Sequence, residues 1–119
     1  MDLIKDVFVA AQDHFKSYRI PSIIRTGKNV LLAFAEARAA LNDHAQNKIV
    51  LKRSEDLGDS WEKLRVIADA GRDSLNNPLV VKVAGTGKII LMYQQYPFTP
   101  VEAVSDPDQW KSHDGQEFP

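Results

Sequence analysis

Charged side chains in three short stretches are the residues of this chain that could carry chemistry. Arg19 stands in the run Tyr18–Pro21, and a guanidinium inside an apolar strand is costly unless it meets an anion or a carboxylate. Arg38 ends a second apolar run, and Asp43 follows it five residues later. Taken singly, each residue has a plainer interpretation. Arg19 could lie on the surface of an edge strand, Arg38 could be a solvated charge, and Asp43 could be half of an Asn-Asp turn pair.

The most specific local pattern is Ser54–Trp61, which reads Ser-Glu-Asp-Leu-Gly-Asp-Ser-Trp. It matches the Asp-box, Ser-x-Asp-x-Gly-x-x-Trp, at all four fixed positions. Ser54 and Asp56 can bond the backbone of a tight turn, Gly58 supplies a φ that other residues resist, and Trp61 can pack over the turn. An ordinary polar loop is the alternative. The motif predicts a stable hairpin and no chemistry of its own.

Short apolar runs must position these residues, and their length and composition are those of strands. The runs are Asp6–Ala10, Arg19–Arg25, Val30–Glu36, Lys48–Arg53, Glu62–Ala68, Leu79–Ala84 and Lys88–Tyr93, with turn residues between them. A helix over Leu32–Leu41, where alanine is frequent, is the competing interpretation. The preceding Gly-Lys-Asn turn and the unbroken VLLAF run favour a buried strand. The sequence therefore predicts an all-β fold.

The spacing of the runs predicts antiparallel units of four strands. Residues 18–68 supply one such unit, and residues 78–95 begin another. Four short strands in roughly 40–50 residues is the blade period of a β-propeller, which needs at least about four blades to close. A chain of 119 residues therefore corresponds to one blade and a half. The proline-containing stretch 97–119 is expected to be an irregular loop.

Composition excludes several classes of function. With 15 basic and 16 acidic side chains and a net charge of −1, the chain has no long-range attraction for nucleic acid or anionic membranes. It contains no cysteine, which rules out disulfides, thiol catalysis and cysteine-ligated zinc. His14, His44 and His113 lack metal-ligand spacing, so neither a metal nor another cofactor is expected. Met1–Ala10 has no secretory apolar core, and no apolar run could span a bilayer, so a cytoplasmic location is the default expectation.

The order of the motifs, more than any one of them, resembles a known family. Tyr-Arg-Ile-Pro at 18–21, Ala-Phe-Ala-Glu-Ala-Arg at 33–38, an aspartate five residues beyond, the Asp-box and Asn77-Pro78 follow one another as in the exo-α-sialidases, or neuraminidases. The resemblance runs from about Tyr18 to about Tyr96 and matches only the first quarter to third of such a protein. It implies a six-bladed propeller and a sialylated glycan as substrate.

The resemblance implies roles for five residues. Arg19 matches one of three arginines that bind the carboxylate of sialic acid, and Asp43 falls where the family keeps its general acid/base. Arg38 and Asn77 match positions at the 4-hydroxyl side of the sugar, and Glu102 stands where some members have a glutamate. We expect the first four of these residues to converge on one rim of the sheet.

The mechanism implied is retaining, with a tyrosine nucleophile that is assisted by a glutamate. That tyrosine, its glutamate and the other two arginines come later in the family's fold, so the rest of the propeller is needed for a complete site. We therefore expect the 119-residue chain alone to be inactive. A non-catalytic Asp-box propeller that binds glycan or acts as a scaffold, and a small β-rich interaction module, are the alternatives. Arg19 and Asp43 argue against the first of these, and the incomplete second unit argues against the other.

Overall fold

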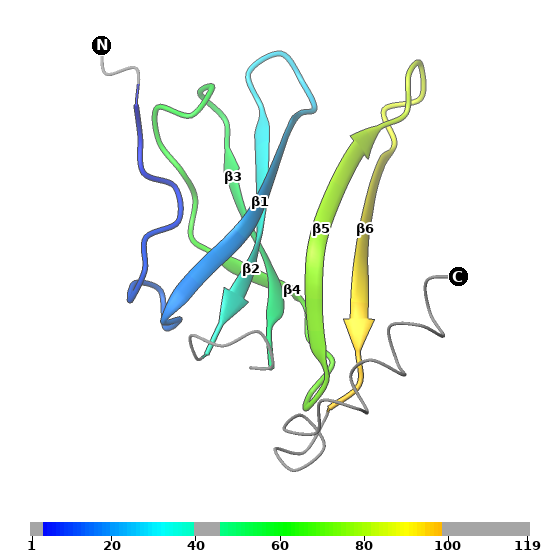
Figure 1. Cartoon of the computed structure of the whole chain (residues 1–119). Helices are drawn as coiled ribbons and strands as arrows, with labels where there is room; N and C mark the ends of the chain where they lie inside the picture. The colour runs from blue at the N-terminus through cyan, green and yellow to red at the C-terminus, as the bar shows by residue number, and fades with distance from the viewer. Residues whose placement is uncertain (1–3, 40–45, 99–119) are drawn as a thin grey trace.

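The fold was analysed in a computed structural model that describes residues 4–39 and 46–98. These residues form strands joined by turns and bends, so the predicted all-β class is confirmed (Figure 1). The alanine-rich stretch is strand, not helix, over its described residues. The strands are β1 (Ser17–Arg25), β2 (Leu31–Arg38), β3 (Lys48–Ser54), β4 (Arg65–Ala68), β5 (Ser74–Lys82) and β6 (Ile89–Tyr96).

The strands make two antiparallel sheets. β1 to β4 form a four-stranded sheet in chain order, and β5 pairs with β6 in a separate two-stranded sheet. In the first sheet, Arg19 of β1 lies opposite Glu36 of β2. Since successive side chains of a strand point to opposite faces, Ala35 and Ala37 share one face of β2, and Glu36 shares the other with Arg38. The alternation therefore separates an apolar face from a face that bears charge.

The N-terminal segment covers the apolar face. Phe8 and Phe15 pack with Tyr18 against a buried cluster of Ala35, Ala37 and Val50. The ring centroids of Phe8 and Tyr18 are 5.4 Å apart, and the Tyr18 hydroxyl donates to the carbonyl of Gln12 at 2.6 Å. Aromatic side chains bury large apolar areas, so this segment supplies much of the core that the small alanine side chains of β2 cannot.

The prediction of a strand at Asp6–Ala10 is wrong, because these residues form bends, a turn and irregular backbone. The carbonyl of Val7 accepts a hydrogen bond from the Lys52 ammonium group at 2.8 Å, and that of Val9 accepts the Gln12 amide at 3.1 Å. A side chain and a local turn thus satisfy polar groups that a sheet partner would otherwise take. The apolar residues lie flat on the sheet instead of extending its edge.

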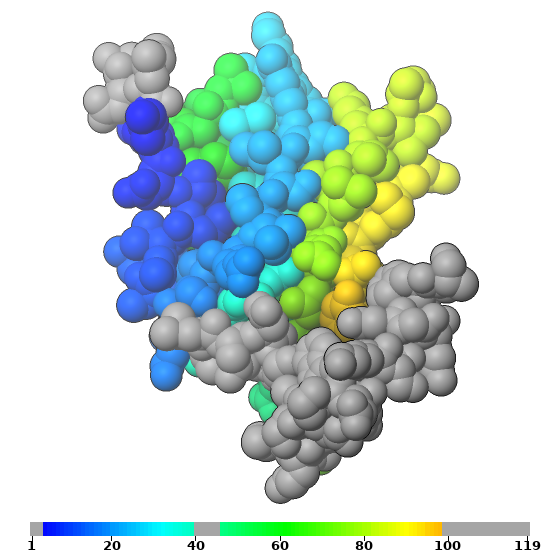
Figure 2. Space-filling view, in the orientation of Figure 1, coloured from blue at the N-terminus to red at the C-terminus, as the bar shows by residue number. Residues whose placement is uncertain are grey.

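The charge-bearing face is covered by β5, which contacts β1, β2 and β3. The Val80 amide donates to the Ser22 hydroxyl at 3.3 Å, and the Leu75 amide donates to the carbonyl of Asn47 at 3.0 Å. Leu75 and Ile49 are fully buried at this junction. Figure 2 shows the β5–β6 hairpin lying directly against β1. The two sheets therefore share a core on the side that carries Glu36.

β1 and β5 contain the same local device, a bulge followed by proline. Ile20 and Asn77 adopt positive φ angles of 53° and 57°, and each stands before a proline at a shift in strand register. A β-branched residue with φ above zero is uncommon, and a bulge of this kind re-aims the side chains beside it. The bulge also explains why β5 begins at Ser74 and not at the predicted Leu79, since it lets a strand pass through Pro78.

The loop 54–61 is held by its own side chains. The buried Ser54 hydroxyl donates to Asp56 Oδ1 at 2.7 Å and accepts the Gly58 amide at 2.8 Å. Asp56 accepts both the hydroxyl and the amide of Ser60, at 2.5 and 2.8 Å. These bonds from Ser60, and then the bond from Ser54, lower the pKa of Asp56 to about 2. The expected bonds of Asp56 to the turn backbone are confirmed, whereas Trp61 is half-buried and not largely buried.

Residues 4–39 and 46–98 contain no helix that is long and apolar enough to cross a membrane. No group of three or more His, Cys, Asp or Glu side chains in the same ranges could hold a metal ion.

Candidate functional site

Three of the five residues singled out from the sequence lie in the described part of the chain. Arg19 is in β1, Arg38 ends β2 and Asn77 is the bulge residue of β5. Asp43 and Glu102 lie outside the described residues.

A buried carboxylate, Glu36, joins the three elements that carry these residues. Glu36 is 1% exposed, its Oε1 lies 3.3 Å from Arg38 Nη2, and Arg38 is itself 3% exposed. The other oxygen, Oε2, accepts the backbone amide of Asn77 at 2.7 Å. These two contacts tie the end of β2 to the bulge of β5.

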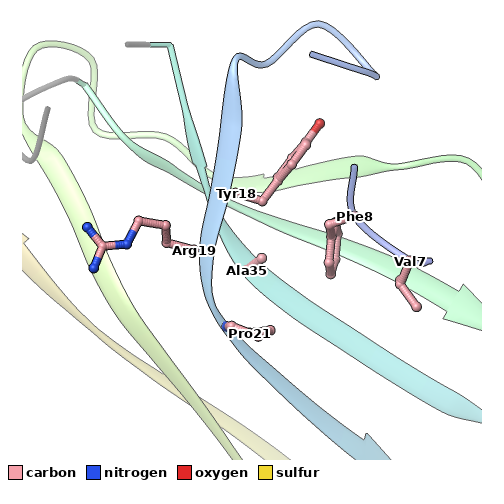
Figure 3. A pocket seen from close by; sticks show the side chains of 6 residues that line it. All are labelled: Val7, Phe8, Tyr18, Arg19, Pro21 and Ala35. Carbon is pink, nitrogen blue, oxygen red and sulfur yellow. The ribbon is translucent and has the colours of Figure 1, made fainter. Parts of the chain in front are cut away.

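Arg19 stands beside this pair on the same face of the sheet. It is the register partner of Glu36, and its side chain is exposed to solvent. In Figure 3 its guanidinium projects toward β5, whereas Tyr18 and Phe8 lie on the other side of β1. Asn77 is exposed as well. The site thus runs from a buried ion pair, Glu36 with Arg38, to an accessible rim that carries Arg19 and Asn77.

The side chain of Asn77 is held by its neighbours on β6. Its Nδ2 donates to Gln94 Oε1, and the same oxygen accepts the Tyr96 hydroxyl at 2.9 Å. An amide whose nitrogen is engaged in this way turns its oxygen in the opposite direction. The rim therefore combines guanidinium donors with an oriented amide, which are groups that suit an anionic and hydroxylated ligand.

The hollow beside β1 is a different feature. It has a volume of about 240 Å³ and is lined by Val7, Phe8, Tyr18, Arg19, Pro21 and Ala35. Its walls are apolar, and the Arg19 guanidinium points away from it (Figure 3). Burial, with a smaller effect of Asp13, raises the pKa of Tyr18, so this phenol keeps its proton more firmly than usual. The hollow is therefore a poor candidate for catalysis.

Sequence reasoning missed Glu36 and the polar residues at the start of β5. Ser74 and Asn76 are buried, and the Ser74 hydroxyl donates to Asn76 Oδ1 at 2.8 Å. A signal for Glu36 does exist in the sequence, because a glutamate two residues before Arg38 in a strand must share its face. No local pattern shows that this face meets β5, since Asn77 lies 41 residues further along the chain.

Comparison with known proteins relates this chain to sialidases. No family model matches it. Two curated proteins that bear the name exo-alpha-sialidase, from Aspergillus fumigatus and Arthroderma benhamiae, are each 35% identical to it over 74 residues. That match covers 56% of this chain but 18% of either relative, so the chain spans only a small part of the proteins it resembles. These similarities support a sialidase-like relationship for the matched part of the chain.

Proposed function

We propose that this chain is the first part of an exo-α-sialidase, an enzyme that hydrolyses terminal sialic acid from glycoconjugates. The observation that carries the proposal is the meeting of Arg38 and Asn77 at Glu36, with Arg19 as its register partner. The identity to curated exo-alpha-sialidases supports the same assignment.

In the proposed enzyme, β1 to β4 are the first blade of a six-bladed propeller and β5–β6 begin the second. The loop 54–61 is then the Asp-box of the first blade. The hairpin leaves an apolar surface uncovered, because the register partners Leu79 with Met92 and Val81 with Ile90 are 39–54% exposed. Such a patch on a soluble domain marks a surface that another element covers. The remaining blades would cover it, and the chain alone would be inactive.

The proposed chemistry assigns one task to each site residue. The Arg19 guanidinium pairs with the carboxylate of sialic acid, because its planar fork matches that group and stays charged at any working pH. Arg38 and Asn77 lie at the 4-hydroxyl side of the sugar, with Glu102 as a further substrate contact. Asp43 protonates the leaving oxygen and then deprotonates the attacking water.

The nucleophile in this scheme is a tyrosine outside the chain, assisted by a glutamate. Sialic acid carries a carboxylate beside its anomeric carbon, and that charge would repel a carboxylate nucleophile. A phenol is neutral as it approaches and avoids this repulsion, which explains why the proposed enzyme departs from the usual pair of carboxylates.

Hydrolysis by the complete propeller tests the proposal. We expect release of sialic acid from sialyllactose and no cleavage of unsialylated lactose. Arg19→Lys should raise KM about tenfold or more, since lysine cannot form the bidentate pair. Arg65→Lys, on the exposed strand β4, is the matched control and should leave KM unchanged. Binding of sialyllactose without hydrolysis would favour a non-catalytic glycan-binding propeller, and a protein that neither binds nor cleaves it would contradict the proposal.

A further inference from the structure

We infer that Glu36 is a positioning residue, which sets the place of Arg38 and Asn77 and thereby the recognition of the 4-hydroxyl side of the substrate. The inference rests on the proposed function and adds to it a residue that neither the motifs nor the expected roles had singled out. Glu36 does not touch substrate in this account. It acts through the two residues that it holds.

The contacts of Glu36 divide its two oxygens between two strands. Oε1 faces Arg38 Nη2 at 3.3 Å within β2, and Oε2 accepts the amide of Asn77 in β5 at 2.7 Å. A hydrogen bond from a backbone amide to a carboxylate is stronger than one to a neutral acceptor. One side chain therefore contacts both the buried cation and the backbone that presents the exposed amide.

The hydrogen bond from the Asn77 amide to Glu36 lies at a residue whose backbone conformation is unfavourable. Asn77 has φ of 57° at the bulge, a conformation that most residues avoid outside turns. Unusual backbone conformations of this kind persist where the surrounding structure holds them, and they concentrate at functional sites. The Glu36 carboxylate supplies that hold on the Asn77 backbone from the neighbouring sheet, and the bond to Gln94 then directs the side chain from that backbone position.

The partners of its two oxygens, Arg38 and the Asn77 amide, separate the role of Glu36 from that of a ligand-binding residue. Its exposure is 1%, whereas Arg19 and Asn77 lie open at the rim. Replacing Glu36 by a neutral residue removes a buried carboxylate that lies 3.3 Å from Arg38 Nη2, and breaking a buried ion pair in this way is strongly unfavourable. We therefore expect the Arg38 side chain, which is 3% exposed, to shift in such a variant. A change at Glu36 should therefore reach the substrate only as displacement of Arg38 and Asn77.

The test compares Glu36→Gln with Glu62→Gln in the complete propeller. Glu36→Gln keeps an oxygen for the Asn77 amide but loses the charge that faces Arg38. Glu62 is an exposed glutamate paired with Arg53 at 2.8 Å, so the matched replacement controls for the loss of a surface ion pair. On an aryl sialoside, Glu36→Gln should raise KM about tenfold while kcat stays within about threefold, the pattern of lost binding and not of lost chemistry. Glu62→Gln should change neither.

A substrate without the 4-hydroxyl distinguishes the loss of one positioned contact from a general disturbance of the binding site. With an aryl 4-deoxysialoside, Glu36→Gln and the unsubstituted protein should have the same KM, because the contact that Glu36 positions no longer exists. An equal KM increase on both substrates would overturn the inference and leave the proposed function standing. An unsubstituted protein that hydrolyses neither substrate would contradict the proposed function and the inference together.

Hydrogen exchange gives a readout that needs no substrate. Glu36→Ala should speed exchange of the Asn77 amide at least about tenfold, and Glu36→Gln should restore most of the protection, since the glutamine oxygen can still accept that bond. Amide protection that is unchanged in Glu36→Ala would show that the carboxylate does not hold the bulge, and it would overturn the inference whatever the kinetics.

Discussion

Replacing Ser54 by alanine tests whether the loop 54–61 is held by its own side chains. Ser54 is 1% exposed, and its hydroxyl accepts the amides of Gly58 at 2.8 Å and of Asp56 at 3.3 Å. It also donates to the Asp56 carboxylate at 2.7 Å. Alanine removes all three bonds at once, with little change in the volume of the side chain.

The expected loss in the free energy of unfolding depends on which of these groups water can reach in the Ser54→Ala variant. The Asp56 carboxylate is exposed and keeps its solvation, and the bond from its own amide is long, so neither contributes much. The Gly58 amide points at the buried hydroxyl, and an amide left without a partner in such a place costs about 1–3 kcal/mol. Partial access from the open side of the loop places the expected loss near the lower end, at about 1–2 kcal/mol in the free energy of unfolding.

Urea unfolding of the full chain, followed by circular dichroism, measures this loss. We expect a lower midpoint with an unchanged slope, which marks a change in stability and not in the compactness of either state. Lys63→Ala is the control, because Lys63 is an exposed residue just beyond the loop and such surface changes usually stay within about 0.5 kcal/mol. A Ser54→Ala variant no less stable than Lys63→Ala would refute the idea that the buried hydroxyl organises the loop.

Three further predictions concern the loop, the bulge and the expected acid. The Asp56 carboxyl should titrate with a pKa of about 2, below its ordinary 3.8. Its contribution to the free energy of unfolding is then complete above pH 3.8 and is lost as the pH falls through about 2. An NMR titration in which Ser60→Ala fails to raise this pKa would count against the bonds from Ser60 to Asp56. Asn77→Val should lower the free energy of unfolding by about 1–2 kcal/mol, because a β-branched residue resists φ of 57°, whereas Asn77→Gly should be tolerated. Equal stabilities of the two variants in thermal unfolding would show that the backbone at this position is not strained. In the complete propeller, Asp43→Asn should reduce turnover of sialyllactose far more than turnover of an aryl sialoside, whose leaving group needs little protonation; equal losses would argue against Asp43 as the general acid.

The strands were predictable because their signal is local. Val, Ile, Leu and Phe in short runs between turn residues gave β1 to β3 to within a few residues. The same signal misassigned Asp6–Ala10, since an apolar run looks alike whether it pairs at an edge or lies on a face. It also placed the start of β5 too late, because a proline and two asparagines hide a strand whose bulge accommodates them. These two errors share a physical origin in tertiary contacts that no short window contains.

The site was predictable only in part, for a related reason. The order of motifs selected Arg19, Arg38 and Asn77, and the structure brings the last two together at Glu36. Their roles toward a substrate stay predictions, as do those of Asp43 and Glu102, which lie outside the described residues. Glu36 was missed because its importance comes from burial and from one bond across the two sheets. A charge in an apolar strand shows that a partner exists but not which one.

An NMR titration of the complete propeller with sialic acid asks whether Arg19 and Asn77 form a rim for an anionic sugar, with Arg38 buried behind it. We expect shifts of the Arg19 and Arg38 side-chain signals and of the Asn77 amide. We also expect the methyl ester of sialic acid, which lacks the charged carboxylate, to bind at least about tenfold more weakly and no longer to shift Arg19. Equal binding of acid and ester, or shifts confined to residues away from this rim, would contradict the account.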